Sequence, residues 1–312
     1  MLDFSNSKIL IVGDVMLDKY YFGKVARISP EAPVPIVNIQ KEESRLGGAS
    51  NVANNIVSLG GHSLLCGVIG HDLFGKEIER ISRHKNIDTF LLKTSSPTIT
   101  KARIIGGKQQ IVRVDYEDKS ELNADNKKLF RDTISRILPE YDILVISDYG
   151  KGLISEDLCR YLIKLAHKYD KKVIIDPKGK NWEKYSGADI VTPNVKELSD
   201  IVGYTVPNTD RAIEKAAREA ITNNHLTALL VTRSDKGMSL IGPIPPIHIP
   251  THSEEVFDVS GAGDTVVATL GLCLAAGFEI SEAMRTANIA AGIVVKKVGT
   301  ATLTIEELVQ QK

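Results

Sequence analysis

The sequence predicts an α/β fold with a mainly parallel central sheet flanked by helices and a small projecting β-sheet. Short apolar runs rich in Val and Ile alternate with helical segments along almost the whole chain, a pattern typical of βαβ units. The apolar runs are unbroken, which indicates strands covered on both faces. Two strand-like insertions interrupt this alternation, and they predict the smaller sheet.

The elements of the central layer follow in order. Lys8–Val12 is expected to be the first buried strand, and the small and apolar spacing of Gly48–Leu59 predicts a packed helix. Later helices are expected over Glu156–Lys168 and Arg211–Asn223, and the chain from Gly261 onward is expected to be helical up to a short tail. The remaining strands share the apolar character and are expected at Leu64–Ile69, Ile143–Ser147, Val173–Asp176, Asp189–Thr192 and Leu229–Thr232.

The two insertions, at about residues 16–40 and 98–116, are expected to form the small sheet. In the first insertion, strands at Tyr20–Gly23 and Val34–Ile39 flank a proline-rich stretch that excludes a continuous helix. The second insertion predicts a β-hairpin with a glycine turn. Because no linker separates these segments from the rest, residues 1–312 are expected to form one domain that carries a β lid.

The charge balance excludes one broad class of partner. The chain has 39 Lys and Arg residues against 39 Asp and Glu residues, which gives a net charge of +0 at pH 7. Proteins that bind nucleic acid through the phosphate backbone usually carry a basic excess, so we expect no nucleic-acid partner. A local cluster of Lys and Arg stays compatible with this balance. The charged stretch Asp118–Lys128 is expected to be a polar connection.

Cysteine usage and hydropathy indicate the compartment. Cys66, Cys159 and Cys273 lie far apart, which favours a reducing cytoplasm over a disulfide framework. The first residues lack a basic segment followed by a long apolar one, and no stretch reaches about 18 apolar residues. We therefore expect a cytoplasmic enzyme or ligand-binding domain that does not contact a membrane.

The strongest motif is the loop Asp258–Thr265, with the sequence DVSGAGDT, directly before a helical segment. Gly261 and Gly263 allow a ligand to approach the backbone closely, and the free N–H groups at the helix start favour an anion such as a phosphoryl group. Asp264 is then placed to take a proton from a hydroxyl at the same site. The alternative interpretation is a turn followed by a helix cap, and a short motif alone does not exclude it.

Further polar residues fall where open α/β sheets bind ligands. Asp14 follows the first strand, and Asn51, after Gly47-Gly48, is able to hydrogen-bond a polyol. Asn194 and Glu197 follow another strand and lie three residues apart on one helix face, where an amide and a carboxylate suit a hydrated Mg²⁺. Taken singly, each is better explained as a turn residue, a helix cap or part of a capping box. Taken together, they favour a ligand site.

This combination resembles the ribokinase or PfkB family of sugar kinases. Gly47–Gly61 (GGASNVANNIVSLGG) is similar to the amino-terminal glycine signature of that family, and Asn194–Glu197 (NVKE) to its NxxE element. Asp258–Leu270 (DVSGAGDTVVATL) is similar to the carboxyl-terminal signature, with Ser260 where Thr is more usual. The resemblance covers essentially the whole chain and implies a ribokinase-like fold.

Within the family, the likeness is to the kinases that act on a heptose 7-phosphate. Gly13–Ile39, which contains ISPEAPVP, carries it together with Thr100–Glu117 and Ile146–Gly152. The resemblance implies transfer of phosphate from ATP to O1 of D-glycero-β-D-manno-heptose 7-phosphate, in the ADP-heptose branch of lipopolysaccharide biosynthesis. In many bacteria that kinase is fused to an adenylyltransferase. Since the kinase pattern ends shortly before Lys312, the expectation is a stand-alone or excised kinase.

The resemblance also implies a role for each matching residue. Asp264 is the base that takes the proton from the anomeric hydroxyl, and the N–H groups of Gly261, Ala262 and Gly263 stabilise the transferred phosphoryl group. The residues implied to hold the sugar hydroxyls are Asp14, Gly48 and Asn51. Those implied to place ATP, and Mg²⁺ through water, are Asn194, Glu197, Thr232, Gly237 and Asn288. Ser234 departs from the family pattern, because a glycine is usual at that position.

A distal phosphate on the sugar requires cations of its own. Lys101, Arg103 and Arg113 alternate on the predicted hairpin, and Lys178 follows a strand, so these four residues are the candidate phosphate ligands. The two arginines offer a bidentate fork for phosphate. The alternative is a solvated edge strand whose positive charges prevent aggregation.

The resemblance further implies ATP and Mg²⁺ as cofactors and a homodimer formed through the lid, and the sequence leaves open whether a monovalent cation activates. One alternative function is a kinase of the same fold that acts on fructose, ribose or another sugar phosphate. Another is a non-catalytic sugar-binding module. The presence of Asp264 between these glycine-rich neighbours argues against the module, because binding alone needs no base.

Overall fold

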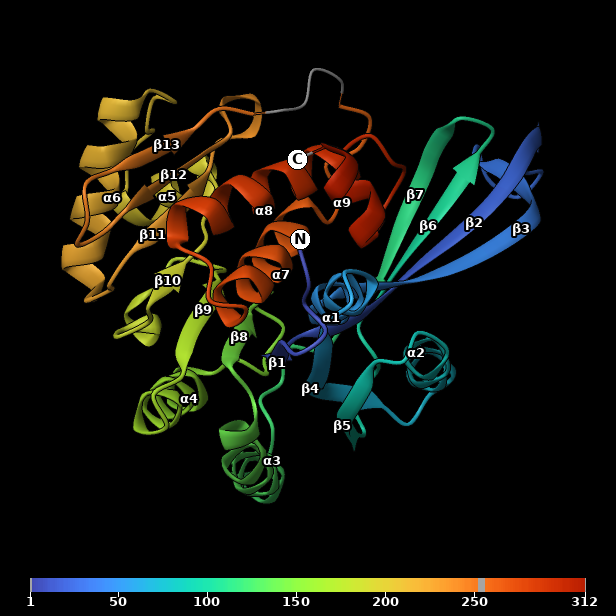
Figure 1. The fold of residues 1–312 in the computed structure, drawn as a ribbon. Helices are drawn as coiled ribbons and strands as arrows, with labels where there is room; N and C mark the ends of the chain where they lie inside the picture. Colours follow the sequence, from blue (N-terminus) through green and yellow to red (C-terminus); the bar gives the residue numbers. More distant parts are fainter. Residues whose placement is uncertain (1, 252–255, 312) are drawn as a thin grey trace.

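The central sheet confirms the predicted mainly parallel layer. Its strands are β1 (Lys8–Gly13), β4 (His62–Gly70), β5 (Asp88–Thr94), β8 (Ile143–Ser147), β9 (Lys172–Asp176), β10 (Ile190–Val191), β11 (Leu229–Thr232), β12 (Met238–Ile241) and β13 (Ile247–Ile249). The computed structural model describes residues 2–251 and 256–311, and within them these nine strands run in the order β13-β12-β11-β10-β9-β8-β1-β4-β5 (Figure 1). The strands from β5 to β11 are parallel, and β12 and β13 pair antiparallel at one edge.

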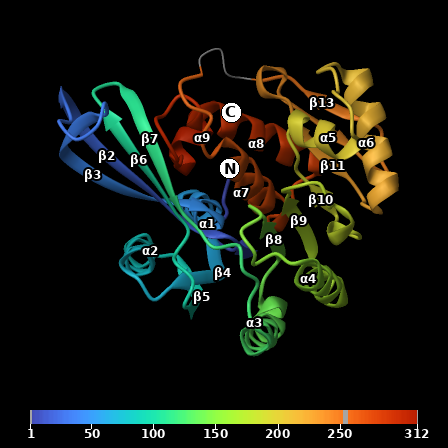
Figure 2. The ribbon, with the colours of Figure 1, turned by 180° about the vertical axis from the view of Figure 1, so that it is seen from behind.

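Helices cover both faces of this sheet. The helices on one face are α1 (Ala49–Ser58), α2 (Leu73–His84), α7 (Ala262–Ala275), α8 (Ile280–Val294) and α9 (Ile305–Gln311). Those on the other face are α3 (Ala124–Ile137), α4 (Glu156–Lys168), α5 (Val195–Val202) and α6 (Asp210–Asn224). Ile9 and Ile11 of β1 pack into the first layer and Leu10 and Val12 into the second, because successive side chains of a strand point to opposite faces. Figures 1 and 2 show α7 and α8 on one side of β8 and β9, with α3 and α4 on the other.

The predicted helix bounds are most accurate where a cap and an apolar stripe coincide. Ser155 is the N-cap of α4, where its side chain accepts a hydrogen bond from the Leu158 N–H group at 3.4 Å. The buried side chains of α4 recur at helical spacing and are Leu158, Cys159, Leu162, Ile163 and Ala166. The observed helix is the predicted one, Glu156–Lys168.

The second sheet forms from the two insertions. Its strands are β2 (Val15–Ile28), β3 (Pro35–Gly48), β6 (Thr100–Gly106) and β7 (Gln109–Tyr116). Within the described residues these four strands lie in the order β3-β2-β6-β7, with β2 parallel to β6 and antiparallel to β3. Figure 1 shows this sheet extending away from the helical layers, with α1 and α2 near its base.

Several predicted boundaries are wrong. The strands of the first insertion are longer than Tyr20–Gly23 and Val34–Ile39, because β2 and β3 continue down to the central domain, so Gly48 ends a strand and does not begin a helix. Only Ile190–Val191 of the predicted strand Asp189–Thr192 is extended. The predicted connection Asp118–Lys128 contains the start of α3, since Asn123 caps the helix at Asn126 N–H.

The helix α3 was missed for a physical reason. Its buried side chains are only Phe130 and Ile134, so its apolar stripe is too narrow to distinguish it from a polar segment. The predicted short tail also contains a helix, α9. Short 3₁₀ turns occur at Leu138–Glu140, Glu183–Tyr185 and Ser234–Lys236.

The structure describes the cysteines and the helices that bear on the expected compartment. Cys66, Cys159 and Cys273 are buried free thiols. In the part of the chain that the structure describes, none of the helices combines the length and apolarity that crossing a bilayer requires. The span predicted for the single domain includes residues 1, 252–255 and 312, which lie outside the described residues.

Candidate active site

Asp264 lies in the first turn of α7 and is almost fully buried. Its Oδ2 accepts a hydrogen bond from Asn51 Nδ2 at 2.7 Å, and its Oδ1 accepts one from the Tyr149 hydroxyl at 2.7 Å. Both donors come from other elements, Asn51 from α1 and Tyr149 from the loop after β8. The carboxylate therefore faces the interior of the site, and the alternative interpretation as a cap of its own helix is wrong.

The environment of Asp264 alters its acidity. Burial is the main cause that raises the pKa of this carboxyl from 3.8 to about 6, and the negative charge of Asp18 acts in the same direction. The hydrogen bonds from Asn51 and Tyr149, and the positive charge of Lys101, lower the pKa in opposition. A carboxylate with a pKa near 6 is a stronger base than a solvated one, yet it is largely ionised at neutral pH.

The backbone before Asp264 forms a helix start with a left-handed N-cap. Gly261 is that N-cap, with φ 79°, and a Cβ added there would lie 2.8 Å from Asn51 Nδ2. The Ala262 N–H group already donates to the Val259 carbonyl at 3.2 Å, which departs from the expectation that it is free. For the N–H groups of Gly261 and Gly263, the described part of the chain supplies no acceptor. These two groups remain open to an anion.

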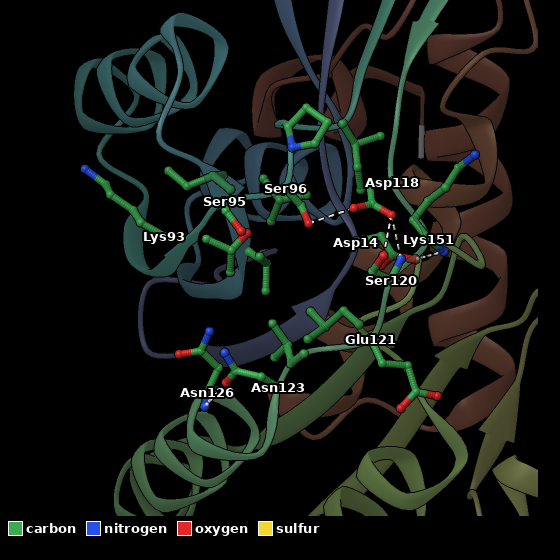
Figure 3. A pocket seen from close by; sticks show the side chains of 18 of the residues that line it. Asp14, Lys93, Ser95, Ser96, Asp118, Ser120, Glu121, Asn123, Asn126 and Lys151 are labelled. Atoms are coloured by element: carbon green, nitrogen blue, oxygen red, sulfur yellow. Dashed lines mark hydrogen bonds between the residues drawn. The ribbon is translucent and has the colours of Figure 1, made fainter.

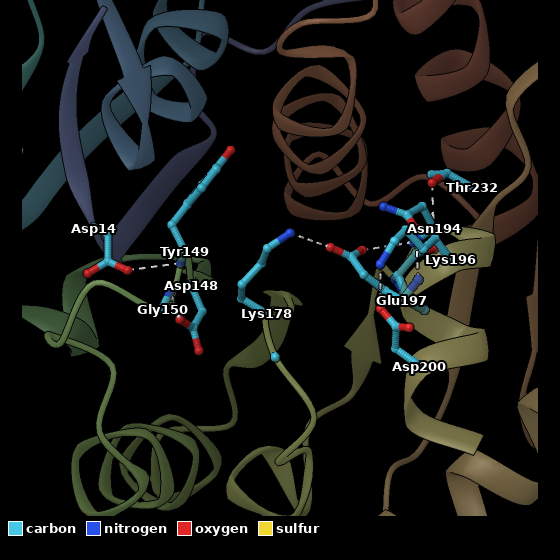
Figure 4. Close-up of polar contacts among 12 residues, drawn as sticks. Asp14, Asp148, Tyr149, Gly150, Lys178, Asn194, Lys196, Glu197, Asp200 and Thr232 are labelled. Atoms are coloured by element: carbon cyan, nitrogen blue, oxygen red, sulfur yellow. Dashed lines mark hydrogen bonds and ion pairs between the residues drawn. The ribbon is translucent and has the colours of Figure 1, made fainter. Parts of the chain in front are cut away.

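Asp14 follows β1 and holds the loop after β8. Its Oδ2 accepts hydrogen bonds from the N–H groups of Tyr149 at 2.9 Å and Lys151 at 3.1 Å, and Figure 4 draws the first of these. Its Oδ1 is buried and has no hydrogen-bond partner among the described residues. Burial, reinforced by Asp148, raises the pKa of Asp14 to about 6. The contacts are long-range, so Asp14 is more than a turn residue.

Gly48 joins Asp14 and Asn51 to the second sheet. It is the last residue of β3 and the N-cap of α1, with φ 57°. A Cβ at this position would lie 2.5 Å from the Asp14 carbonyl oxygen. Only a glycine therefore lets α1 start this close to Asp14, with Asn51 in its first turn.

Asn194 and Glu197 form the capping box that the sequence left as an alternative. Asn194 Oδ1 accepts from the Glu197 N–H group at 2.9 Å, and Glu197 Oε2 accepts from the Asn194 N–H group at 3.1 Å. Lys178 Nζ donates to Glu197 Oε1 at 2.8 Å, as Figure 4 shows. Lys178 thus contacts Glu197, one of the residues predicted to place ATP. The side chains of Asn194 and Glu197 still have acceptor positions open to a ligand after they form the capping box.

Lys101, Arg103 and Arg113 share one face of the second sheet. Arg103 pairs directly with Arg113 across β6 and β7, and Lys101 lies two residues before Arg103, so the three side chains point to the same side. Arg103 Nη1 contacts Asp18 Oδ1 at 2.6 Å in a largely buried ion pair. Arg113 pairs with Asp115 on its own strand at 2.8 Å and is half exposed.

The three cations therefore differ in environment. β6 is an inner strand and β7 an edge strand, so the edge-strand alternative applies to Arg113 and not to Lys101 or Arg103. Lys101 stands 5.5 Å above the ring of Tyr149, and no ion pair is found for it within the described residues. Burial is the main cause that lowers the pKa of Lys101.

The other residues predicted on the nucleotide side lie near β11 and α8. Thr232 ends β11 and bridges to Asn194, which brings these two predicted residues together. Asn288 is buried on α8 and donates to the Pro250 carbonyl at 2.7 Å. Gly237 and Ser234 both have positive φ, 77° and 55°. The left-handed backbone at Ser234 explains why a glycine is favourable at this position.

A pocket of about 580 Å³ lies beside Asp14 (Figure 3). Its wall includes Asp14 and Lys151 at one end and Lys93, Asn123 and Asn126 at the other. Of the predicted site residues, only Asp14 lines it. The Lys151 ammonium pairs with Glu117 and that of Lys93 with Glu79, so both cations of the pocket already have carboxylate partners.

The fold brings to this site three residues that the sequence did not predict. Tyr149 follows β8, Asp176 ends β9 and Asp18 lies on β2 beside Arg103. Burial, and then the charge of Asp264, raises the pKa of Asp176 well above its ordinary value. Tyr149 and Asp176 lie at the carboxyl ends of neighbouring parallel strands, which is the signal that could have indicated them. For Asp18 no sequence signal was available, since its pairing depends on the second sheet.

Comparisons with known proteins agree with this architecture. The model of the pfkB family carbohydrate kinases matches residues 6–307. The chain is 46% identical over 308 residues to Bifunctional protein HldE of Haemophilus influenzae (strain PittEE), covering 98% of this chain and 63% of that protein. It is 45% identical over 310 residues to Bifunctional protein HldE of Vibrio vulnificus (strain YJ016), covering 99% and 64%. The chain thus spans somewhat less than two thirds of these relatives.

Solved structures show the same fold at low sequence identity. The phosphofructokinase-2 of Escherichia coli, in complex with potassium, superposes with a TM-score of 0.80 at 20% identity and covers 97% of each chain. The ribokinase of Arabidopsis thaliana, complexed with ribose and ATP, gives a TM-score of 0.76 at 19% identity and covers 98% of each chain. The fold is ribokinase-like. With a family model that extends over nearly all of its length, this chain belongs to the pfkB family of carbohydrate kinases.

Proposed function

We propose that this sugar kinase transfers the γ-phosphoryl group of ATP to O1 of D-glycero-β-D-manno-heptose 7-phosphate, in the ADP-heptose branch of lipopolysaccharide biosynthesis. The observation that carries the proposal is the buried Asp264 carboxylate, held by two donors beside open N–H groups at the start of α7. The similarity to HldE proteins over 98% of the chain supports the choice of sugar.

The reaction uses few groups. Asp264 accepts the proton of the anomeric hydroxyl while O1 forms a bond to the γ-phosphorus and the bond from that phosphorus to the β,γ-bridging oxygen breaks. The electron pair of the broken bond leaves with ADP. The N–H groups of Gly261 and Gly263 donate to the phosphoryl oxygens, on which negative charge is concentrated. On the sugar side, Asp14 and Asn51 orient the hydroxyls.

The polar residues near Glu197 fit a hydrated Mg²⁺. The charge of Asp264 raises the pKa of Asp176, and Glu197 adds to this effect, so a cation near these carboxylates relieves repulsion. No group of three or more His, Cys, Asp or Glu residues in the described chain is arranged to hold a metal directly. Asn194 and Glu197 would therefore hold Mg²⁺ through water together with the ATP phosphates. When bound, the ion neutralises negative charge on the phosphates. Potassium is the monovalent cation to add to the kinase assay as a candidate activator.

Replacing Arg113 tests whether this residue binds the distal phosphate of the sugar. Arg113→Ala is expected to raise the KM for the heptose 7-phosphate about tenfold, because charge-assisted hydrogen bonds to phosphate are worth roughly 1.5–3 kcal/mol. The KM for ATP is expected to stay within about twofold. Steady-state kinetics with each substrate varied in turn measures both constants.

Lys108 is the matched control, since it is an exposed cation at the turn of the same hairpin. Lys108→Ala removes the same charge and is expected to leave both KM values unchanged. Equal effects of Arg113→Ala on the sugar and on ATP would remove Arg113 from the phosphate site.

The substrate itself is tested with a panel of acceptors. An ADP-release assay compares the heptose 7-phosphate with ribose, fructose and fructose 6-phosphate at equal concentration. The proposal expects a kcat/KM at least about 100-fold higher for the heptose 7-phosphate, which corresponds to about 2.7 kcal/mol of discrimination. Preference for another acceptor would identify a different kinase of this fold, and binding without ADP release would identify a sugar-binding module.

We also propose a homodimer formed through the outer face of the second sheet. Val112 and Val114 of β7 point away from Arg113 and are about 40–45% exposed. Val114→Asp is expected to convert the dimer to a monomer in sedimentation equilibrium, because it places a charge in an apolar interface. Lys108→Asp, at the nearby turn, is expected to leave the dimer intact. A wild-type chain that sediments as a monomer would contradict the proposal.

A further inference from the structure

Tyr149 connects the two ends of the site. Its backbone N–H group donates to Asp14 Oδ2 at 2.9 Å, and its hydroxyl donates to Asp264 Oδ1 at 2.7 Å. Figure 4 shows its side chain extending away from the loop that contacts Asp14. Tyr149 thereby links Asp14, which is proposed to orient the sugar, to Asp264, which is proposed to lie beside the transferred phosphoryl group.

The Tyr149 phenol is held in one protonation state and one orientation. Burial, followed by the charge of Asp264, raises the pKa of Tyr149 well above its usual value, so the hydroxyl remains a donor. The Lys101 ammonium lies over the ring at 5.5 Å, an arrangement in which the cation is attracted to the ring face. The ring is therefore packed on one side and anchored at its hydroxyl.

The hydrogen bonds leave the base able to act. Each oxygen of an ionised carboxylate has about two acceptor positions. On Asp264, Tyr149 occupies one position of Oδ1 and Asn51 occupies one position of Oδ2. One position on each oxygen remains for the hydroxyl of a substrate. The two donors also restrain the carboxylate, since each donates to a different oxygen.

We propose that Tyr149 is a positioning residue for the base, whose hydroxyl holds Asp264 in its ionised form and aims it at the acceptor hydroxyl. The inference rests on the proposed function, because it assigns the role of base to Asp264. Tyr149 acts through Asp264 and does not need to touch the sugar.

Charges on three other elements face the same carboxylate. Asp18 on β2 disfavours its ionised form, whereas Lys101 on β6 favours it. Asp264 in turn raises the pKa of Asp176 on β9. Tyr149 and Asn51 act with Lys101 against Asp18 and against burial. Loss of the Tyr149 hydroxyl therefore shifts the balance toward protonated Asp264.

Tyr149→Phe tests the inference, since phenylalanine keeps the ring and the backbone N–H group to Asp14. The acidic limb of the kcat profile, expected near pH 6 in the parent protein, is expected to move upward by about one pH unit. At pH 6 kcat is expected to fall about fivefold, because the ionised fraction of Asp264 drops from about one half to about one eleventh, and at pH 8.5 by less than about threefold. The KM for the sugar is expected to change little.

Tyr185→Phe is the matched control. Tyr185 also donates its hydroxyl to a buried carboxylate, that of Asp148, at 2.7 Å. The same substitution there removes a comparable bond without touching the base, and it is expected to leave the acidic limb in place. Equal shifts in both variants, or no shift in Tyr149→Phe, would overturn the inference.

A second measurement separates this inference from the proposed function. Carbon NMR of carboxyl-labelled aspartate, assigned by comparison with Asp264→Asn, follows the titration of Asp264 without any turnover. An upward shift in Tyr149→Phe supports the positioning role even if the heptose 7-phosphate proves not to be the substrate. An unchanged titration overturns it even if that kinase activity is present.

Discussion

Replacing Asp264 with asparagine is expected to lower kcat by about 10²–10⁴-fold, the range that general base catalysis contributes. An asparagine side chain has nearly the same shape but cannot accept the proton of the acceptor hydroxyl. The KM values for ATP and sugar are expected to stay within about threefold, because Asp14 and the open N–H groups of α7 are unchanged. Single-turnover kinetics over pH 6–9 measures the loss at the chemical step.

The same variant is expected to keep its stability. Asp264 is buried among Asp18 and Asp176, so the neutral amide relieves repulsion while it keeps a hydrogen-bond acceptor for Tyr149 or Asn51. A melting temperature at or above that of the parent protein would show that the loss of activity is chemical. A kcat within about tenfold of the parent value would remove Asp264 from the role of base.

Gly261→Ala is the second substitution with a large expected effect. It places a side chain on a residue with φ 79° and a Cβ 2.8 Å from Asn51 Nδ2, so the loop has to shift and the bond from Asn51 to Asp264 is weakened. We expect kcat to fall by about 10²-fold, comparable to the loss of one donor that stabilises a developing charge. The left-handed backbone costs about 1–2 kcal/mol, which lowers the melting temperature by a few degrees.

Gly263→Ala serves as the control for folding, because a Cβ at that position has no described atom within 4 Å. Its melting temperature is expected to equal or exceed that of the parent, since alanine favours the helix. Calorimetry of the two variants side by side gives the comparison. A Gly261→Ala protein as stable and as active as the parent would show that the N-cap geometry is unimportant.

The sequence predicted the elements whose local signals agree with each other. The strand Ile143–Ser147 and the helix Glu156–Lys168 were predicted with the bounds that the structure has, because an apolar run or a capped apolar stripe defines each. Where the local sequence signal was weak, or where an element depends on tertiary contacts, the prediction was wrong. The helix α3 buries only two side chains, and the length of β2 and β3 depends on their pairing with each other.

The same distinction applies to the candidate site. Asp14, Asn51 and Asp264 were predicted from turn and glycine signals. In the structure Tyr149 links Asp14 to Asp264, and Asn51 donates to Asp264 directly. Tyr149 itself has no distinguishing motif, since its role depends on where the loop after β8 lies relative to α7. The ion pair between Arg103 and Asp18 is likewise a consequence of the register between β2 and β6, which composition does not encode.

Phosphorus NMR of the reaction product tests the central claim most directly. With ATP, Mg²⁺ and the heptose 7-phosphate, we expect a new phosphate signal coupled to the anomeric proton, with formation of one ADP for each 1,7-bisphosphate. The signal is expected to be absent with Asp264→Asn over the same time. A new phosphate on any other carbon, or no transfer to the heptose 7-phosphate while another sugar is phosphorylated, would contradict the account.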